Sequence, residues 1–442
     1  MDLKPGRPLE APEVAELLTE ARARTLLLIG PLDRDELRTQ HSPLMSPIVW
    51  DLGHIAHFEE VWLLEKLHGR HGADGEGLRG MYNPFENPRS ERDDLPLPEA
   101  YEALDYMAAV RRDALSGLAR VDLSSQDPLL RDGFVFRMVL QHEYQHNETI
   151  LQTLQLKQGR PYPALRGLQV PEAPAGGPEP GAMVRFPGGE VVLGTDDRSI
   201  AYDNERGRHV KDLPPFDIDA TPVTCGEYLA FMEAGGYERS DLWSPEGWAW
   251  LQESGAQAPA YWSWEDGAWR VHTMDRHRPV DPRRPVCHVT FHEAEAYARW
   301  VGKRLPTEAE WEAAASWDPA TGRKRLWPWG DQPPDPTRAN LDAVTFDVAP
   351  VGSYPAGVSP VGCHQMIGDV WEWTASEFEG YPGFEAFPYR EYSEVFFGPA
   401  HRVLRGGSWA TRPGAIRTTF RNWDYPIRRQ IFSGFRCARD AT

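Results

Sequence analysis

Up to about Pro163, apolar residues recur along the chain with the spacing of an α-helix. The clearest case is the run Val14, Leu17, Leu18 and Ala21, in which positions i, i+3 and i+4 are apolar. Ser46 followed by proline is typical of a helix start, because serine caps the first turn and proline fits within it. Four helices of this kind predict a helical bundle. Their expected ranges are 14–28, 47–67, 98–118 and 134–157.

From about Met183 onwards the pattern changes. Tryptophan, glycine and proline are frequent there, and the apolar stretches are short and alternating, as in Val184–Phe186 and Glu190–Gly194. Helical spacing returns in two places, near Cys225–Ala234 and Phe291–Val301. This texture predicts an irregular α+β domain in which loops predominate.

The two textures are separated by a stretch that has neither period. Residues 171–182 read PEAPAGGPEPGA, a composition that is typical of a linker. A chain of 442 residues is also too long for one ordinary core, so more than one domain is expected. The resulting division is a helical bundle, a Pro/Gly linker and an α+β domain, at residues 1–165, 166–182 and 183–442.

The charge of the chain argues against a nucleic-acid partner. The formal net charge is −19, whereas phosphate backbones are bound through basic surfaces. No stretch approaches the roughly 20 apolar residues that cross a bilayer, and the early run Leu26–Ile29 is too short for a signal peptide. We therefore expect a cytoplasmic protein that binds neither nucleic acid nor membrane. Its cysteines form no C-x-x-C pair and are expected to be buried apolar residues rather than zinc ligands.

Histidines on two of the predicted helices have the spacing of metal ligands. His142 and His146 are one turn apart, about 6 Å along the axis, on a stripe that is otherwise largely apolar. Two imidazoles buried together without a partner are costly, and a bound metal removes that cost. His54 and His57 share a face of the second helix and offer a third nitrogen. This arrangement predicts a metal site in the bundle with coordination positions left open for substrates.

The segment HEYQH at 142–146 also matches the H-E-x-x-H pattern of zinc proteases, in which Glu143 would be the general base. That interpretation needs a third ligand further along the chain, and Glu148 lies too close to supply it. Glu143 also points away from the face that the two histidines share, so we expect it to be exposed to solvent. The bundle site is the better interpretation.

Six motifs of the second half occur in a fixed order. They are TPVTCG at 221–226, RLPTEAEWE at 304–312, WPWG at 327–330, MIGDVWEWT at 366–374, RGGSW at 405–409 and GFRC at 434–437. In these motifs the domain resembles the formylglycine-generating enzyme, or sulfatase-modifying factor, a variant of the C-type lectin fold. That enzyme uses a cysteine pair shortly after RGGS, where this chain has Thr411 and Ile416. The resemblance therefore implies the fold without the sulfatase-activating chemistry.

The first half resembles DinB-like four-helix bundles, in which three histidines bind a divalent metal. The two halves in this order resemble the EgtB-type sulfoxide synthases of ergothioneine biosynthesis. The resemblance rests on LMSPIVWDLGHI at 44–55, QHEYQHNE at 141–148 and FRNWDYPIRRQ at 420–430.

Enzymes of this family bind iron(II) and use dioxygen to join a cysteine sulfur to C2 of hercynine, the betaine of histidine. They also oxidise that sulfur to the sulfoxide. For this chain the resemblance implies that His54, His142 and His146 hold Fe(2+). It places His57 behind the ligands and not among them.

The resemblance also implies substrate contacts. By motif position, Asn422 and Gln145 contact hercynine, and Trp423 faces its trimethylammonium group by cation–π attraction. Asp424 and Arg428 contact the thiol substrate, Asp424 through the ammonium group of that substrate.

The thiol donor is left open by the sequence. Arg89 and Arg92, in PRSER at 88–92, match a pair that binds the γ-glutamyl carboxylate in the actinobacterial-type enzymes. The residues around them depart from that pattern, so cysteine and a selenium donor stay beside γ-glutamylcysteine, which we favour. Nine arginines and one acid lie between Arg402 and Arg439, which predicts a cationic pocket for carboxylates. More than half of these arginines are expected to be structural.

A tyrosine near the iron is expected to donate a proton or an electron during the reaction. The family places it in a loop before RGGSW, which here reads FPYREYSEVFF and offers Tyr389 and Tyr392. Motif alignment favours Tyr389 as the catalytic residue.

Two other functions fit parts of the pattern. A DinB-type thiol transferase would use zinc or another divalent metal and no oxygen. A non-catalytic binding module would use the lectin-like domain and would keep its ligand affinity without His142. The joined motifs favour the oxygenase.

Overall fold

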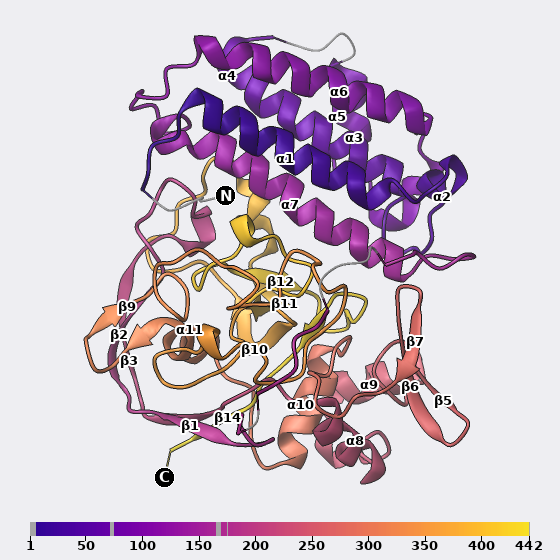
Figure 1. The fold of residues 1–442 in the computed structure, drawn as a ribbon, viewed down its shortest axis with the longest axis vertical. Helices are drawn as coiled ribbons and strands as arrows, with labels where there is room; N and C mark the ends of the chain where they lie inside the picture. The colour runs from indigo at the N-terminus through magenta and orange to yellow at the C-terminus, as the bar shows by residue number, and fades with distance from the viewer. Residues whose placement is uncertain (1–5, 71–74, 165–168, 175, 442) are drawn as a thin grey trace. The chain divides into compact units, whose positions relative to one another are not determined.

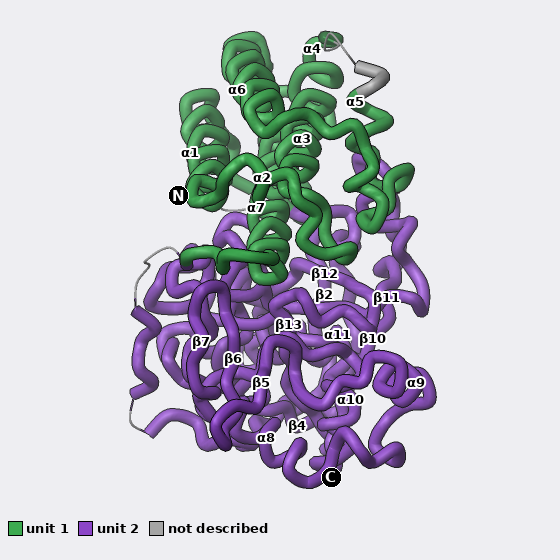
Figure 2. Tube along the Cα trace, turned by 90° about the vertical axis from the view of Figure 1, so that its right-hand side faces the viewer, with its two compact units in different colours: residues 1–163, 197–200 green, residues 164–196, 201–442 purple. Residues whose placement is uncertain are grey.

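The chain forms two compact units (Figure 2). The computed structural model describes residues 6–70, 75–164, 169–174 and 176–441, with the backbone alone at 75–77. Unit 1 comprises Met1–Pro163 and Asp197–Ile200, and unit 2 comprises Ala164–Asp196 and Ala201–Thr442. Residues 197–200 fall in the range that the sequence gives to the second domain. In the structure they belong to unit 1, where the Gln141 side chain donates a hydrogen bond to the Ile200 carbonyl.

Unit 1 is a bundle of four long helices, as predicted (Figure 1). They are α1 (Ala11–Ile29), α3 (Ile48–Glu59), α6 (Ala100–Gly117) and α7 (Phe134–Gln155). The predicted second helix is longer than α3, because a π-helical turn, η1 (Glu60–Glu65), and α4 (Lys66–His68) continue it. Two short helices, α2 (Arg34–Arg38) and α5 (Gly75–Met81), were not predicted, since neither is long enough to show a period. No helix in the described part of the chain is both long and apolar enough to cross a membrane.

Four buried charged residues, one from each long helix, form a hydrogen-bonded cluster inside the bundle. We call Arg22 (α1), Glu59 (α3), Arg111 (α6) and Glu143 (α7) the charge quartet. Arg22 donates to Glu59 at 2.8 Å and to Glu143 at 2.9 Å. Arg111 donates to Glu59 at 2.6 Å and to Glu143 at 2.8 Å. None of the four is more than 7% exposed, so two positive and two negative charges balance one another out of contact with water.

The expectation that Glu143 is exposed to solvent was wrong. Its side chain leaves the face of the two histidines, but it points into the bundle, where Thr25 also donates to it at 2.8 Å. Burial alone would raise the pKa of Glu143, but the guanidinium groups of Arg22 and Arg111 hold it below its usual value. The pattern along one helix did not show this, because the partners of the acid lie on other helices.

Replacing Arg111 by methionine is expected to destabilise the bundle by about 3–5 kcal/mol, since the quartet is then left with an uncompensated buried charge. Urea unfolding of the full chain followed by far-UV circular dichroism measures the change. The matched control is Arg112→Met, the same substitution at the next, exposed residue. It is expected to stay within about 0.5 kcal/mol of the wild type. Equal stability of the two variants would show that the quartet does not hold the bundle together.

Unit 2 is an irregular α+β domain, as predicted, with small sheets set among long loops (Figure 1). One sheet has the strand order β12-β11-β10-β13, and another has the order β1-β4-β14. The strands β2 and β3 form a hairpin, β5, β6 and β7 form a three-stranded sheet, and β8 pairs with β9. The strand bounds are β1 (Met183–Phe186), β2 (Gly189–Leu193), β3 (His209–Leu213), β4 (Phe216–Asp219), β5 (Trp262–Glu265), β6 (Ala268–Thr273), β7 (Arg276–Pro279), β8 (Trp317–Asp318), β9 (Arg323–Lys324), β10 (Trp371–Phe378), β11 (Gly398–Arg405), β12 (Asn422–Asp424), β13 (Ser433–Gly434) and β14 (Ala438–Asp440).

Two helices of unit 2 were predicted and two were missed. The predicted ones are α8 (Cys225–Glu233) and α10 (Phe291–Trp300), and the missed ones are α9 (Pro245–Ser254) and α11 (Glu308–Ser316). Every residue of α11 is buried, so the helix has no polar face and shows no amphipathic period. Its start was nevertheless visible in the sequence, because Thr307 and Glu310 form a capping box.

The four cysteines are free, and three of them are buried, as expected of apolar residues. The buried ones are Cys225, Cys363 and Cys437, whereas Cys287 is half-buried.

Candidate metal centre

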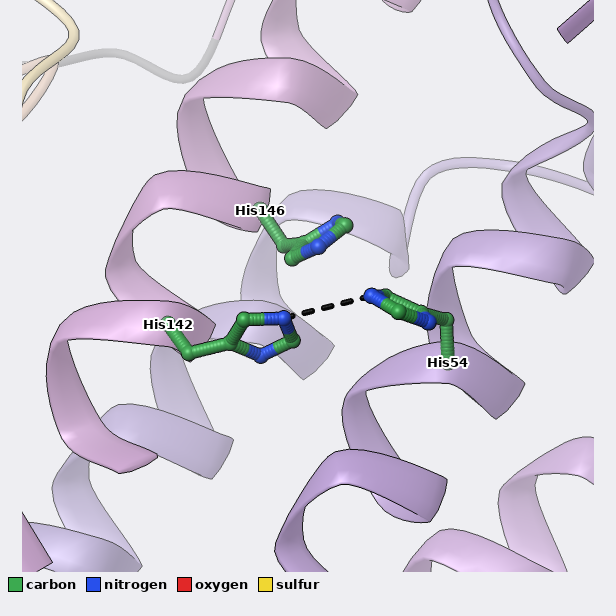
Figure 3. A group of neighbouring side chains, drawn as sticks. All are labelled: His54, His142 and His146. Carbon is green, nitrogen blue, oxygen red and sulfur yellow. Dashed lines mark hydrogen bonds between the residues drawn. The ribbon is translucent and has the colours of Figure 1, made fainter. Parts of the chain in front are cut away.

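Three histidine side chains from two helices of unit 1 point toward one another (Figure 3). His54 lies on α3, and His142 and His146 lie one turn apart on α7. The Nε2 atoms of His54 and His142 are 3.2 Å apart, and one ligand nitrogen from each of the three lies within 4.8 Å of the others. Within the described residues, no other group of histidines, cysteines and acids has this geometry. The predicted ligands therefore come together, and His57 lies outside the group, as expected.

The helix α3 presents an aromatic stripe to the site. Trp50, His54 and Phe58 follow one another at intervals of four residues, so they lie on one face of the helix. The rings of Trp50 and His54 stack with centroids 4.8 Å apart and planes 12° apart. Phe58 stacks on His142 of α7 with centroids 3.7 Å apart and planes 9° apart. Two of the three imidazoles are thus held flat against an aromatic ring of α3.

Hydrogen bonds on the far side of two imidazoles fix which nitrogen faces the centre. The Nδ1 atom of His54 is 2.9 Å from the carbonyl oxygen of Tyr82, and Nδ1 of His146 is 3.1 Å from Oδ1 of Asp51. Both oxygens are acceptors, so in the neutral rings each Nδ1 carries the proton and each Nε2 keeps a lone pair. Asp51 is 1% exposed and lies inside the motif at 44–55, but the sequence did not single it out.

The approach of the Tyr82 loop depends on a glycine of α3. A Cβ atom at Gly53 would lie 2.1 Å from the phenol ring of Tyr82, so any larger residue would push the loop away. The carbonyl that accepts from His54 belongs to the same tyrosine. Gly53 therefore allows the contact that orients one ligand.

This donor set fits a divalent metal ion. Burial lowers the pKa of His54 and of His142 well below the usual value, so both rings are neutral at physiological pH. With their Nδ1 atoms bonded on the outer side, His54 and His146 direct Nε2 toward one point, where a cation can accept their lone pairs. Three imidazole ligands with outer-side hydrogen bonds to a carboxylate and a carbonyl are typical of metal sites in proteins.

The position of Glu143 rules out the zinc-protease interpretation. Its Oε1 accepts hydrogen bonds from Arg22 and Thr25, and its Oε2 accepts from Arg111. A carboxylate held in this way inside the bundle cannot act as a general base on a metal-bound substrate.

The predicted substrate residues of unit 1 lie in different environments. Gln145 is half-buried on α7, between the two histidine ligands of that helix. Arg89 and Arg92 both lie on a short 3-10 helix, η2 (Arg89–Asp94), but Arg92 is only 4% exposed, whereas Arg89 is half-buried. The guanidinium carbon of Arg92 lies 3.5 Å from the ring centroid of Trp50, and burial lowers the pKa of Arg92 to about 10. Carboxylate binding by this pair stays a prediction.

Four predicted substrate residues of unit 2 lie close together along the chain. Asn422, Trp423 and Asp424 make up β12, and Nε of Arg428 is 3.8 Å from Oδ1 of Asp424. The Trp423 ring stacks on Phe378 with centroids 4.1 Å apart and planes 9° apart. The predicted acid and arginine are therefore brought together.

The two candidate tyrosines differ in their packing. Tyr389 precedes η8 (Arg390–Tyr392), and the Tyr392 ring stacks on Tyr202 with centroids 4.0 Å apart. Tyr392 also meets Trp423 edge to face at 5.9 Å. Burial raises the pKa of Tyr389 well above its usual value.

The arginine-rich segment, residues 402–439, does not form the predicted cationic pocket. Each of its nine arginines lies within 3.8 Å of a carboxylate of unit 2, and the acids come mostly from distant parts of the sequence. Five of the nine are buried, which confirms that more than half are structural: Arg405, Arg412, Arg417, Arg421 and Arg436. The excess of positive charge along the sequence is thus cancelled in space.

The two units match two known domain families. Residues 17–150 match the DinB superfamily, and residues 169–441 match the sulfatase-modifying factor enzyme 1-like domain. Fold and site together define a DinB-type metal-binding bundle joined to a sulfatase-modifying-factor domain.

Full-length relatives share both domains. The hercynine oxygenase of Mycolicibacterium thermoresistibile is 47% identical over 436 residues, which cover 97% of this chain and 95% of that protein. The hercynine oxygenase of Mycobacterium tuberculosis is 48% identical over 428 residues, covering 96% of this chain and 97% of that protein. The chain belongs to the hercynine oxygenase family.

A more distant relative matches a smaller part of the chain. The formylglycine-generating enzyme of Streptomyces coelicolor is 35% identical over 312 residues, which cover 61% of this chain and 95% of that protein. Thr411 and Ile416 occupy the positions after RGGS at which a formylglycine-generating enzyme is expected to have its cysteine pair. Both are buried. Thr411 accepts a hydrogen bond from the backbone of Ser408 at 2.8 Å. This segment therefore serves packing and not thiol chemistry.

Replacing any one of His54, His142 or His146 by alanine is expected to abolish stoichiometric metal binding, because two imidazoles hold a divalent ion much less tightly than three. Equilibrium dialysis with Co²⁺ under anaerobic conditions, followed by elemental analysis, measures the bound metal. His57→Ala is the matched control on the same face of α3 and is expected to keep one metal per chain. Loss of metal from His57→Ala, with binding intact in His54→Ala, would reverse the assignment of the third ligand.

Proposed function

We propose that this protein is an iron(II)- and dioxygen-dependent sulfoxide synthase of ergothioneine biosynthesis. The observation that carries the proposal is the three-histidine site, in a chain that is 47–48% identical to hercynine oxygenases over nearly its full length. The reaction joins the sulfur of a cysteine thiol to C2 of hercynine and oxidises that sulfur.

The reaction balances with dioxygen as the only oxidant. The C2–H bond of hercynine and the S–H bond of the thiol are broken, and a C–S bond forms, which releases two protons and two electrons. Oxidation of the sulfur to the sulfoxide releases two more electrons. Dioxygen accepts all four, one oxygen atom going to the sulfoxide and the other to water.

Iron is the metal that this chemistry requires, because a bound Fe(2+) ion exchanges electrons with dioxygen, whereas zinc does not. His54, His142 and His146 would hold it through Nε2. Three protein ligands leave coordination positions for the substrates, as in other non-haem iron sites with few protein ligands. Hydrogen bonds from the ring N–H groups to Asp51 and Tyr82 keep the imidazoles in the tautomer that binds metal.

The thiol substrate is proposed to bind at Asp424 and Arg428. The two side chains are 3.8 Å apart and each is about a fifth exposed, so both charges are accessible. The substrate carries an ammonium group, which suits Asp424, and more than one carboxylate, of which one suits Arg428. Arg89 and Arg92 are proposed to bind the γ-glutamyl carboxylate of γ-glutamylcysteine, the favoured donor.

Hercynine is proposed to contact Gln145, Asn422 and Trp423. Its trimethylammonium group cannot donate a hydrogen bond, so an aromatic face is the natural partner for its charge. Trp423 is the aromatic side chain proposed for this contact, and its ring stacks on Phe378. The amides of Gln145 and Asn422 offer donors and acceptors for the imidazole and carboxylate groups of the substrate.

Tyr389 is proposed as the residue that donates a proton during the reaction. It lies in the loop before RGGSW, and a phenol carries a proton at neutral pH that it can donate. Tyr392 is the weaker candidate, because its ring is stacked on Tyr202 and has a packing role.

The reaction is tested by anaerobic loading of the full chain with iron(II), followed by oxygen-uptake measurements with hercynine and either γ-glutamylcysteine or cysteine. We expect one dioxygen consumed per sulfoxide conjugate formed with γ-glutamylcysteine, and product masses identify the conjugate. The His142→Ala variant is the control and should consume no oxygen. If a conjugate forms with cysteine and not with γ-glutamylcysteine, cysteine is the thiol donor.

Two other outcomes would contradict the proposed function. Thiol transfer that proceeds with zinc and without oxygen would make the protein a DinB-type thiol transferase. Absence of oxygen uptake with either thiol would exclude the sulfur chemistry and turn the search to a selenium donor.

Tyr389→Phe is expected to lower kcat by roughly 100-fold or more, because only the proton donor is lost and the ring is kept. Iron content should stay at the wild-type value. Tyr392→Phe is the matched control, and since its stacked ring is unchanged, its kcat should stay within about twofold of the wild type. If Tyr392→Phe lowers kcat strongly and Tyr389→Phe does not, Tyr392 is the proton donor.

A further inference from the structure

The loop that carries the two candidate tyrosines is held at both ends by one buried carboxylate. We call residues 387–393 the tyrosine loop. Asp203 is 1% exposed, and its Oδ2 accepts a hydrogen bond from the backbone N–H of Phe387 at 3.1 Å. Its Oδ1 accepts a hydrogen bond from the hydroxyl of Ser393. The two donors are the first and last residues of the tyrosine loop, so both tyrosines lie between them.

The residues on either side of Asp203 also contact the tyrosine loop. The side-chain amide of Asn204 donates to the hydroxyl oxygen of Ser393 at 3.0 Å, so the proton of that hydroxyl is available to Asp203. The ring of Tyr202 stacks on Tyr392 with centroids 4.0 Å apart. Residues 202–204 therefore hold the start, the middle and the end of the loop.

The tyrosine loop has little packing of its own. Ser393 is completely buried, whereas Arg390 and Glu391 are exposed to solvent. A loop with exposed residues and few buried contacts opens easily unless other elements hold it. Its position therefore depends on the contacts that residues 202–204 provide.

The segment that provides these contacts is itself fixed within unit 2. It forms a short 3-10 helix, η5 (Asp203–Glu205). The carboxylate of Glu205 accepts from Nε of Arg417 at 2.8 Å, and Nη1 of Arg421 donates to the carbonyl of Asn204 at 2.8 Å. Both arginines are buried. A carboxylate on an element that is fixed in this way can hold a loop in one position.

We propose that Asp203 is a positioning residue for Tyr389, which keeps the tyrosine loop where the phenol can donate its proton. The proposal rests on the role of Tyr389 in the proposed function. Proton transfer requires the donor within hydrogen-bond reach of the reacting group, so a displaced loop slows the reaction. Asp203 lies outside the metal ligands and the proposed thiol-binding pair, so metal binding and thiol binding are left unchanged.

The test compares Asp203→Asn with Asp219→Asn in the full-length, iron-loaded protein. Asp219 is the matched control, because it is also a buried acid of unit 2 with one backbone donor and one side-chain donor. It accepts from the backbone N–H of Cys437 at 2.8 Å and from the ammonium of Lys303 at 2.5 Å. In the part of the chain that the structure describes, its carboxylate has no hydrogen bond to the tyrosine loop.

Hydrogen–deuterium exchange followed by mass spectrometry measures whether Asp203 holds the loop, without any turnover. In Asp203→Asn the peptide that contains Phe387 is expected to exchange roughly tenfold faster than in the wild type, because its amide loses the carboxylate acceptor. In Asp219→Asn this peptide should exchange at the wild-type rate. Wild-type exchange in Asp203→Asn would overturn the proposal.

Steady-state kinetics measure whether the position of the loop matters for the reaction. Asp203→Asn is expected to lower kcat roughly tenfold or more, with wild-type iron content and wild-type KM for the thiol. Asp219→Asn should keep kcat within about twofold of the wild type. A wild-type kcat in Asp203→Asn, beside a low kcat in Tyr389→Phe, would overturn the proposal.

A double variant separates positioning from general damage to the domain. Because Asp203 acts through Tyr389, Asp203→Asn should cause no further fall in kcat when Tyr389 is already replaced by phenylalanine. The same fall in both backgrounds would make Asp203 a structural residue and overturn the proposal. If Tyr389→Phe alone keeps the wild-type kcat, the proposed role of Tyr389 is wrong and the positioning role falls with it. The exchange measurement then still shows whether Asp203 holds the loop.

A milder variant covers the case in which Asp203→Asn does not fold. Ser393→Ala removes one of the two donors and leaves the carboxylate in place. It is expected to lower kcat by a few-fold and to speed the exchange of the same peptide. A folded Ser393→Ala with wild-type kcat and wild-type exchange would also overturn the proposal.

Discussion

The charge quartet is the constraint on which unit 1 depends. A single ion in an apolar interior costs several kcal/mol, and a partner removes that cost only when the hydrogen-bond geometry is good. Because the four charges come from four helices, one relative placement of α1, α3, α6 and α7 satisfies all of them. Glu59 is five residues from His54 on α3, and Glu143 is adjacent to His142 on α7. The placement that pairs the charges therefore also brings the ligand histidines together.

The same helix that provides one ligand also holds the other two. Within α3, Trp50 and Phe58 stack on His54 and His142, and Asp51 accepts from His146. Side chains four residues apart share a face, so the spacing of these residues follows from the helix itself. A metal site needs its ligands in place before the ion arrives, because otherwise binding must offset their loss of freedom. Concentrating these contacts on one rigid element provides that order.

The sequence predicted those features that repeat along one element and missed those that join several. The periods of α1, α3, α6 and α7, the spacing of His142 and His146 and the order of the motifs all lie within continuous stretches. Glu143 was taken for a surface residue because its partners, Arg22 and Arg111, lie on other helices. Asp51 was overlooked for the same reason, since only the packing of α3 against α7 shows that it faces His146.

Unit 2 shows why charge along a sequence differs from charge in space. The run of arginines near its C-terminus suggested a cationic pocket, yet each arginine pairs with an acid of unit 2, in most cases from a distant segment, and the five buried arginines belong to the core. The longest of these separations, 3.8 Å, is that between Arg428 and Asp424, and both side chains are partly exposed. An ion pair that is widely spaced and exposed to solvent contributes little to the free energy of folding. It is therefore the pair that a zwitterionic substrate can occupy at the lowest cost in stability, which is why recognition is assigned to it and not to the arginine-rich segment as a whole.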